Sequence, residues 1–129
     1  MEWIRPKFQE MLASGRKYVL CGDWNIAHTA MDIRNAKSNE KNSGFLPEER
    51  AWLSQLIKQD GWVDSYRHLK PTDQDYTWWS QRGAARANNV GWRIDYQMVS
   101  TNLKDKLQNC SIVAEPKFSD HAPFIVDYS

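Results

Sequence analysis

The sequence contains few of the features that mark secreted or membrane proteins. It has two cysteines, Cys21 and Cys110, and neither has the spacing of a metal-ligand set or a redox motif. We therefore expect reduced thiols and a cytoplasmic, intracellular protein. No apolar run approaches membrane-spanning length, and Glu2, Arg5 and Lys7 lie where a signal peptide would have its apolar core. These absences predict a soluble protein without membrane attachment.

Charge of one sign is also scarce, since the formal net charge of the 129 residues is only +1. This value argues against a generic polyanion-binding tail, although a local basic face can sit on a nearly neutral molecule. The length allows one domain with a real core. Tryptophan is abundant, with seven residues, which is more indole than a core of this size needs. We expect some of these side chains to form the walls of a pocket or surface.

Helical and extended patterns are mixed along the chain, and neighbouring strands near its end permit antiparallel pairing. The sequence thus predicts a mixed α/β (α+β) fold. Within the last long strand, Trp92, Ile94 and Tyr96 should face away from the side chains between them. Residues 26–45 lack periodicity, and 62–69 is expected to be a connector. We expect helices over 1–14, 47–60 and a short segment ending at 107, and strands over 17–21, 76–79, 92–99, 110–113 and 124–126.

The stretch from Tyr18 to Asn25 contains an apolar run that stops at Gly22 and is followed by Asp23 and Asn25. In an extended chain these two polar side chains point to the same side, with Trp24 opposite. Such a strand end can hold a hard metal ion or a polarised water. Gly-Asp-x-Asn is equally an ordinary turn signal, so both interpretations stand on local grounds.

Three other places have residues suited to chemistry. Asp95 lies within a strand pattern, where a carboxylate needs a partner, and His121 is a natural one. Asp120 precedes that histidine in a tight polar triplet. Asn39 and Asn42 lie in a loop whose charges and amides suit phosphate contact. A solvent-facing Asp95, an ordinary turn and a solvated loop are the alternatives at these three places.

Several motifs together resemble the exonuclease III family of abasic-site endonucleases, within the endonuclease/exonuclease/phosphatase superfamily. The Gly-Asp-x-Asn and Ser-Asp-His motifs are shared across that superfamily, while the Asn-Val-Gly-Trp-Arg-Ile-Asp-Tyr string is narrower and indicates the DNA-repair branch. The resemblance runs from about Lys17 to Tyr128. Its motifs are Gly22-Asp-Trp-Asn-Ile-Ala-His28, Asp32-Ile-Arg-Asn35, Lys41-Asn-Ser-Gly-Phe45, Tyr76-Thr-Trp-Trp-Ser80, Asn89-Val-Gly-Trp-Arg-Ile-Asp-Tyr96 and Ser119-Asp-His-Ala-Pro123.

The resemblance implies catalytic roles for particular residues. Asp23 would orient or deprotonate the attacking water, and Asn25 would position it. Asp95 and His121 would form a hydrogen-bonded pair at the scissile phosphate. Asp120, with Asp23 and Asn25, would hold Mg²⁺, or Mn²⁺ in its place. Residues expected to bind DNA or to form the walls of a pocket for an abasic sugar are Asn39, Asn42, Arg86, Trp78, Trp92 and Ile94.

The resemblance also implies a DNA-repair nuclease of base excision repair. Its activity would be metal-dependent hydrolysis 5′ to abasic sites in duplex DNA, together with 3′–5′ exonuclease or 3′-phosphodiesterase activity. Its partner would be double-stranded DNA with abasic sites or 3′ ends, and the full-length protein would be a monomer. The family fold is a DNase-I-like, four-layered α/β sandwich with a largely antiparallel sheet and flanking helices.

Only the C-terminal half of that sandwich is represented, so we expect residues 1–129 to be the C-terminal portion of a single domain. The first half supplies further site residues in the family, and we expect the chain by itself to have little nuclease activity. The sheet face that packs on the other half should be exposed and apolar. Two alternatives stay open: another phosphatase or phosphodiesterase of the superfamily, or a non-catalytic DNA-binding fragment.

Overall fold

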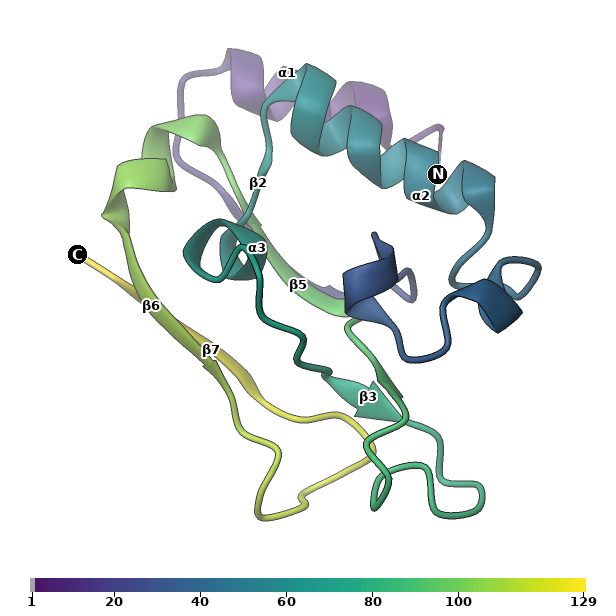
Figure 1. Cartoon of the computed structure of the whole chain (residues 1–129). Helices are drawn as coiled ribbons and strands as arrows, with labels where there is room; N and C mark the ends of the chain where they lie inside the picture. The colour runs from purple at the N-terminus through teal and green to yellow at the C-terminus, as the bar shows by residue number, and fades with distance from the viewer. Residues whose placement is uncertain (1) are drawn as a thin grey trace.

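The computed structural model describes residues 2–129, and in it α1 (Arg5–Ala13) and α2 (Pro47–Ser54) cover one side of a strand layer (Figure 1). Helix α2 has a π-helical extension, η3 (Gln55–Asp60), and α3 (Ser65–Leu69) is a further short helix. Short 3-10 helices are η1 (Ala30–Asp32), η2 (Lys37–Asn39) and η4 (Thr101–Lys106). The strands are β1 (Val19–Asp23), β2 (Val63–Asp64), β3 (Trp78–Trp79), β4 (Gly91–Trp92), β5 (Asp95–Val99), β6 (Leu107–Ile112) and β7 (Phe124–Tyr128).

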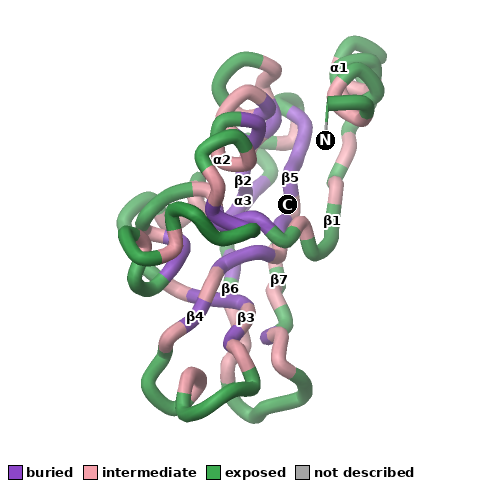
Figure 2. Tube along the Cα trace, turned by 90° about the vertical axis from the view of Figure 1, so that its right-hand side faces the viewer, coloured by how far each residue is buried: buried purple, intermediate pink, exposed green. Residues whose placement is uncertain are grey.

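All the strand pairings are antiparallel. One sheet has the order β1-β5-β2, and two further ribbons pair β3 with β4 and β6 with β7. Strand β5 is buried at most of its positions, whereas β1 is largely exposed (Figure 2). The mixed, largely antiparallel α/β class expected from the sequence is confirmed. No helix within residues 2–129 has the length and apolar character needed to span a bilayer.

The helical segment formed by α2 and η3 begins and ends as its sequence predicts. Pro47 occupies the first turn, and the Glu49 carboxylate accepts hydrogen bonds from the backbone N–H groups of Gly44 and Leu46 at 2.8 and 3.0 Å. These bonds satisfy donors that the helix start leaves without helical partners. Gly61 ends the segment with φ of 97°. Trp52, Leu53 and Leu56 form the apolar stripe of this segment, which packs onto the sheet. Together with Ile26, Trp62, Tyr96 and Met98 they make up the main core.

Several element boundaries differ from the sequence predictions, and the following are the clearest cases. The first helix begins at Arg5 rather than in the region of Met1, and Met1 lies outside the described residues. The connector expected over 62–69 contains β2 and α3, because a two-residue strand is set by pairing with β5 rather than by local pattern. The first strand is displaced by two residues and ends at Asp23.

The prediction of a single strand over 92–99 is wrong. The chain forms β4, breaks at Arg93 and Ile94, and continues as β5. Arg93 is 1% exposed, and its guanidinium donates to Asp32 at 2.8 Å and to Asp64 at 3.0 and 2.6 Å. The break follows from this burial, since a charged guanidinium is stable inside a protein only where acceptors surround it. Arg93 thereby joins η1, β2 and the start of β5.

Candidate active site

Two carboxylates face each other across the β1–β5 pair, because Asp23 is directly opposite Asp95 in the register. His121, from the segment that leads into β7, lies between them. Its Nδ1 is 2.9 Å from Asp95 Oδ2, and its Nε2 is 3.7 Å from Asp23 Oδ2. Like charges in opposed positions destabilise a strand pair, and the imidazole offsets this repulsion. The predicted Asp95–His121 pair is confirmed, and we call these three residues the Asp–His cluster.

Thr77 fixes the backbone on both sides of this cluster. Its buried Oγ1 accepts hydrogen bonds from the N–H groups of Ile94 and Asp95 at 3.0 and 3.2 Å. Its carbonyl oxygen accepts from the N–H of Ala122 at 2.7 Å, next to His121. A single threonine thus ties the two segments that provide the Asp95–His121 pair. Sequence reasoning missed it, because a threonine among aromatic residues is typical of any strand.

The electrostatics of the cluster favour a protonated imidazole. Partial burial of His121 opposes protonation, but the hydrogen bond with Asp95 and the charges of Asp95, Asp23 and Asp120 outweigh it. Together they hold the pKa of His121 above its ordinary value. The side chains of His121 and Asp23 are 33% and 37% exposed, so both are accessible to a substrate. The cluster can therefore place a positive charge beside an anionic group while keeping carboxylates available to a metal or water.

Asn25 joins this site through a turn rather than through strand alternation. Its φ of 56° is left-handed, and its N–H donates to Asp23 Oδ1 at 2.9 Å. An asparagine tolerates this conformation, and the bond is of the Asx-turn type. Trp24 turns the other way and packs against Phe8, Trp52 and Tyr96 in the core. The turn interpretation of Gly-Asp-x-Asn is therefore confirmed, since a turn rather than an extended chain brings Asn25 beside Asp23. The metal ion or polarised water at this strand end stays a prediction.

A small cavity of about 270 Å³ lies against the Asp–His cluster. The rings of Trp78 and Trp92 meet edge to face with centroids 6.2 Å apart, and they form its apolar walls. Gly44 packs tightly behind Trp92, because a Cβ at this glycine would lie 2.7 Å from the indole. We call this cavity the tryptophan pocket, which is lined by Asn25, Ser43, Trp78, Trp92, Ile94 and His121.

The remaining residues singled out from the sequence lie around this site without joining the cluster. Asp120 Oδ2 accepts from the indole N–H of Trp78 at 3.1 Å. Asn39 donates to the carbonyl of Asn35 at 2.9 Å and accepts from the side chain of Asn42 at 2.8 Å, so both asparagines organise their own loop. The metal role of Asp120 and the DNA contacts of Asn39 and Asn42 stay predictions. Ser43 is a pocket residue that sequence reasoning missed, since a serine in a loop gives no signal.

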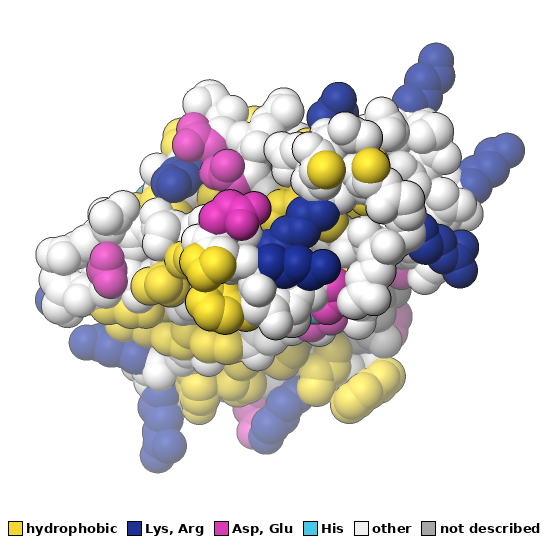
Figure 3. Space-filling model, turned by 90° about the horizontal axis from the view of Figure 1, so that it is seen from below, with side chains coloured by type: hydrophobic (Ala, Val, Ile, Leu, Met, Phe, Trp, Pro, Cys, Tyr) yellow, Lys and Arg dark blue, Asp and Glu magenta, His cyan; other side chains and the backbone are white. Residues whose placement is uncertain are grey.

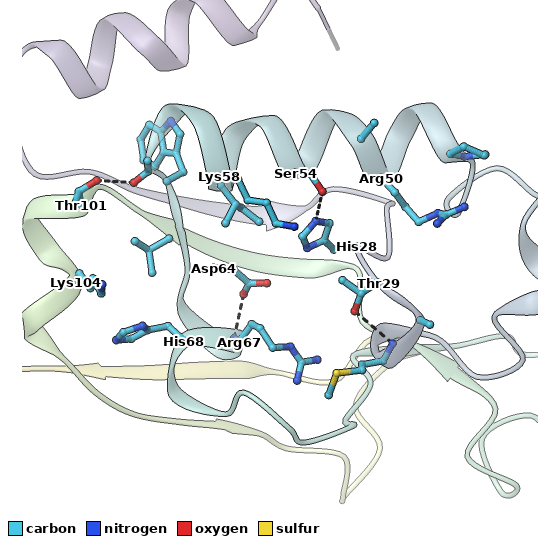
Figure 4. Close-up of a pocket in the computed structure, with 18 residues that line it drawn as sticks. His28, Thr29, Arg50, Ser54, Lys58, Asp64, Arg67, His68, Thr101 and Lys104 are labelled. Carbon is cyan, nitrogen blue, oxygen red and sulfur yellow. Dashed lines mark hydrogen bonds between the residues drawn. The ribbon is translucent and has the colours of Figure 1, made fainter.

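A cavity larger than the tryptophan pocket lies elsewhere, between α2 and α3 (Figure 4). This groove has a volume of about 1050 Å³ and shares no lining residue with the tryptophan pocket. Figure 4 shows Arg50, Ser54 and Lys58 along one face of α2 and its extension η3, with His28 beneath them. His28 Nε2 lies 2.8 Å from Ser54 Oγ. Among residues 2–129, the one grouping of acidic and imidazole side chains close enough to share a metal ion is the Asp–His cluster. Cavity size alone therefore does not locate the chemistry.

Comparison with known proteins decides the family. The model of the Endonuclease/Exonuclease/phosphatase family matches residues 3–121. The chain belongs to this family. It is 41% identical over 126 residues to an exodeoxyribonuclease of Bacillus subtilis, covering 95% of this chain and 50% of that protein. The resemblance to exonuclease III-type and abasic-site nucleases is confirmed.

Solved structures of family members agree with the fold. The AP endonuclease LMAP from Leishmania major has a TM-score of 0.79 and 36% identity, over 85% of this chain and 34% of that one. The 3′ phosphatase NExo from Neisseria, bound to product DNA hairpin, has a TM-score of 0.86 and 28% identity, over 95% of this chain and 49% of that one. The fold is therefore DNase-I-like. The chain spans about half the length of the relatives it matches or less.

The Asp–His cluster suits the metal dependence of the family. One ligand atom from each of Asp23, Asp95 and His121 lies within 4.8 Å of the others. The two carboxylates supply the oxygen donors that Mg²⁺ and Mn²⁺ prefer, and the exposure of Asp23 leaves room for metal-bound waters. Because His121 already contacts Asp95, we expect the free carboxylate oxygens to be the principal ligands.

Proposed function

We propose that the chain is the C-terminal portion of one endonuclease/exonuclease/phosphatase domain that hydrolyses duplex DNA 5′ to abasic sites and also acts at 3′ ends. The observation that carries this proposal is the position of the Asp–His cluster against the tryptophan pocket. The Asp–His cluster supplies groups for phosphodiester hydrolysis, and the tryptophan pocket supplies apolar walls close to the reacting phosphate. Identity of 41% with an exodeoxyribonuclease supports the same activity.

Each residue of the Asp–His cluster, and Asn25 beside it, has a chemical task in this proposal. Asp23 orients the attacking water and accepts its proton, and Asn25 holds the water through its side-chain amide. The imidazolium of His121, held by Asp95, faces the phosphate and stabilises negative charge that develops on its oxygens. A bound Mg²⁺ adds Lewis-acid stabilisation of that charge. Asp23, Asn25 and Asp120, the ligands expected from the sequence, would hold it together with Asp95.

Substrate choice follows from the tryptophan pocket. A volume of about 270 Å³ with walls from Trp78, Trp92 and Ile94 accepts a sugar that has lost its base and is turned out of the duplex. The pocket offers few groups for reading a base edge, so recognition depends on shape and on phosphate contacts. Figure 3, which views the molecule from below, shows basic and acidic side chains beside a band of hydrophobic ones. The basic side chains on this face are the ones suited to phosphate contact without base readout.

Activity of the whole protein is expected to need more than these 129 residues, since the relatives are about twice as long. We therefore propose that the chain alone binds abasic duplex but cleaves it weakly or not at all. The protein would act as a cytoplasmic monomer when combined with the rest of its domain. Mg²⁺-dependent cleavage by the purified chain that disappears in Asp23→Ala would contradict the low activity proposed for the chain.

The substrate class is tested by comparing ligands under one set of conditions. Fluorescence anisotropy would measure the affinity of the chain for a duplex with one abasic site, for the same duplex undamaged, and for a soluble inositol phosphate. We expect the abasic duplex to bind most tightly, with an affinity that falls steeply as salt increases. Tighter binding of the inositol phosphate would instead favour a phosphatase acting on small phosphates.

A further inference from the structure

One guanidinium group joins the two ends of the loop that leads to Asp120 and His121. Arg86 Nη1 donates to the carbonyl oxygen of Ser119 at 2.7 Å, and Nη2 donates to that of Ala114 at 2.6 Å. This loop follows β6 and precedes β7, and much of it is exposed. The planar fork of an arginine fixes two acceptors at once, which the ammonium group of a lysine does not. Arg86 therefore closes the loop at its base.

The partner of this guanidinium on its other side is Trp79. The guanidinium carbon of Arg86 lies 4.5 Å from the centroid of the Trp79 ring, a cation–π distance. The indole N–H of Trp79 donates to Asn89 Oδ1 at 3.0 Å, which ties the ring to the loop that carries Arg86. The backbone N–H of Trp79 donates to the carbonyl oxygen of Asp120 at 3.2 Å. Arg86 and Trp79 thus hold the same loop at successive positions.

Both hydrogen bonds of the Arg86 side chain go to neutral carbonyl oxygens rather than to carboxylates. Buried or half-buried arginines usually pair with acids, so the geometry indicates that the fork, rather than charge neutralisation, is what the loop requires. The residues immediately after this anchor are Asp120, whose carboxylate reaches Trp78, and His121, whose ring reaches Asp95.

We propose that Arg86 is a positioning residue that holds Asp120 and His121 in place beside Asp23 and Asp95. This proposal rests on the function proposed above for the Asp–His cluster. It assigns Arg86 a role other than the direct DNA contact expected from the sequence. Arg82 offers a matched comparison, since it lies in the same loop, is exposed, and donates no side-chain hydrogen bond among the described residues.

The affinity for Mn²⁺ tests this role, because substitution of Arg86 should weaken Mn²⁺ binding whereas substitution of Arg82 should not. Loss of a positive charge near a cation site favours cation binding by Coulomb's law, so Arg82→Ala should leave the Mn²⁺ dissociation constant within about twofold or lower it. Arg86→Ala and Arg86→Lys should both raise it by about tenfold, as loss of groups that orient ligands does. Titration followed by electron paramagnetic resonance measures these constants. Retained or tighter Mn²⁺ binding in both Arg86 variants would overturn the proposal.

Amide hydrogen exchange tests the same role without metal or DNA. In Arg86→Lys we expect the N–H groups of Trp79 and Ala122 to exchange about tenfold faster, while amides of β5 keep their rates. Unchanged exchange at both positions overturns the proposal. If Arg86→Ala does not fold, Arg86→Lys decides the matter. If the unsubstituted chain binds no Mn²⁺, the proposed function of the cluster fails, and the exchange rates still decide the role of Arg86.

Discussion

At the scale of the residue, the site depends on one imidazole between two carboxylates. His121 is placed by its bond to Asp95, and Asp95 is placed by the two backbone bonds that Thr77 accepts. Sequence reasoning predicted the Asp95–His121 pair, because a carboxylate inside a strand needs a partner and few partners were available. It did not predict Thr77 or Ser43, since their side chains acquire a role only when distant segments meet.

The carboxylate of Asp23 should dominate cation binding. We predict that Asp23→Asn raises the Mn²⁺ dissociation constant by about tenfold or more, because one of the three carboxylates proposed to hold the ion is lost. Isothermal titration calorimetry measures this change. Asp127→Asn is the matched control, since Asp127 is an exposed carboxylate on β7. Equal effects of the two substitutions would contradict a specific site.

His28 should make the stability of the fold depend on pH. Burial lowers the pKa of His28 below its ordinary 6.5, assisted by Arg93 and Lys58 and opposed by Asp32 and Asp64. The folded state thus binds this proton more weakly than the unfolded state does. The contribution of His28 to the free energy of unfolding is therefore greatest above pH 6.5 and falls as pH decreases through 6.5 toward the lowered pKa, by at most about 1.4 kcal/mol per pH unit for one proton.

Urea unfolding at several pH values between 5 and 8 checks this dependence. We expect His28→Gln to flatten the fall in stability below pH 6.5, because glutamine keeps a polar group near Ser54 without taking up a proton. His68→Gln, at an exposed position on the same groove, is the control. An unchanged pH dependence in His28→Gln would assign the fall in stability to other groups.

At the scale of the element, the sequence was most informative where local chemistry sets the boundary. The helix over 47–60 was predicted because Pro47, the two following glutamates and Gly61 each act within a few residues. Strand β2 could not be predicted, since its two residues are extended only through pairing with β5. The break between β4 and β5 was missed because the acceptors of Arg93 lie 61 and 29 positions away in the chain.

The ion network of Arg93 should be a principal support of these elements. We predict that Arg93→Ala lowers the free energy of unfolding by about 3–5 kcal/mol, because it leaves Asp64 buried without its ion-pair partner and Asp32 paired with Arg67 alone. Urea denaturation measures the loss. Lys7→Ala is the comparison, since its ion pair with Glu10 is exposed and should be worth less than about 0.5 kcal/mol. A small effect of Arg93→Ala would show that the network contributes little.

At the scale of the molecule, large apolar side chains remain exposed. Val19, Phe118 and Ile125 are 38%, 71% and 47% exposed. Along β1, the exposed residues Val19 and Cys21 alternate with Leu20, which packs toward the helices. The sheet side away from α1 and α2 is therefore partly apolar. This agrees with the exposed face expected for a chain of about half the length of its relatives. The family resemblance predicted such a face, because only one half of the two-half fold is represented, and the fold shows which side chains form it.

Exposed apolar area should make the isolated chain self-associate. We predict that its weight-average sedimentation coefficient rises with concentration between about 5 and 100 μM and that Val19→Thr combined with Ile125→Thr reduces the rise. Sedimentation velocity measures it. A chain that stays monomeric over this range would contradict the prediction.

The central claim is that the tryptophan pocket beside the Asp–His cluster selects a sugar without its base. The most direct test is the ratio of affinities for abasic and undamaged duplex, measured with Trp92→Ala and with Trp3→Ala as the matched control. Trp3 is 81% exposed and lies outside the pocket. We predict that the chain prefers the abasic duplex, that Trp92→Ala brings the ratio close to one, and that Trp3→Ala leaves it unchanged. Equal affinity of the unsubstituted chain for the two duplexes would contradict the claim.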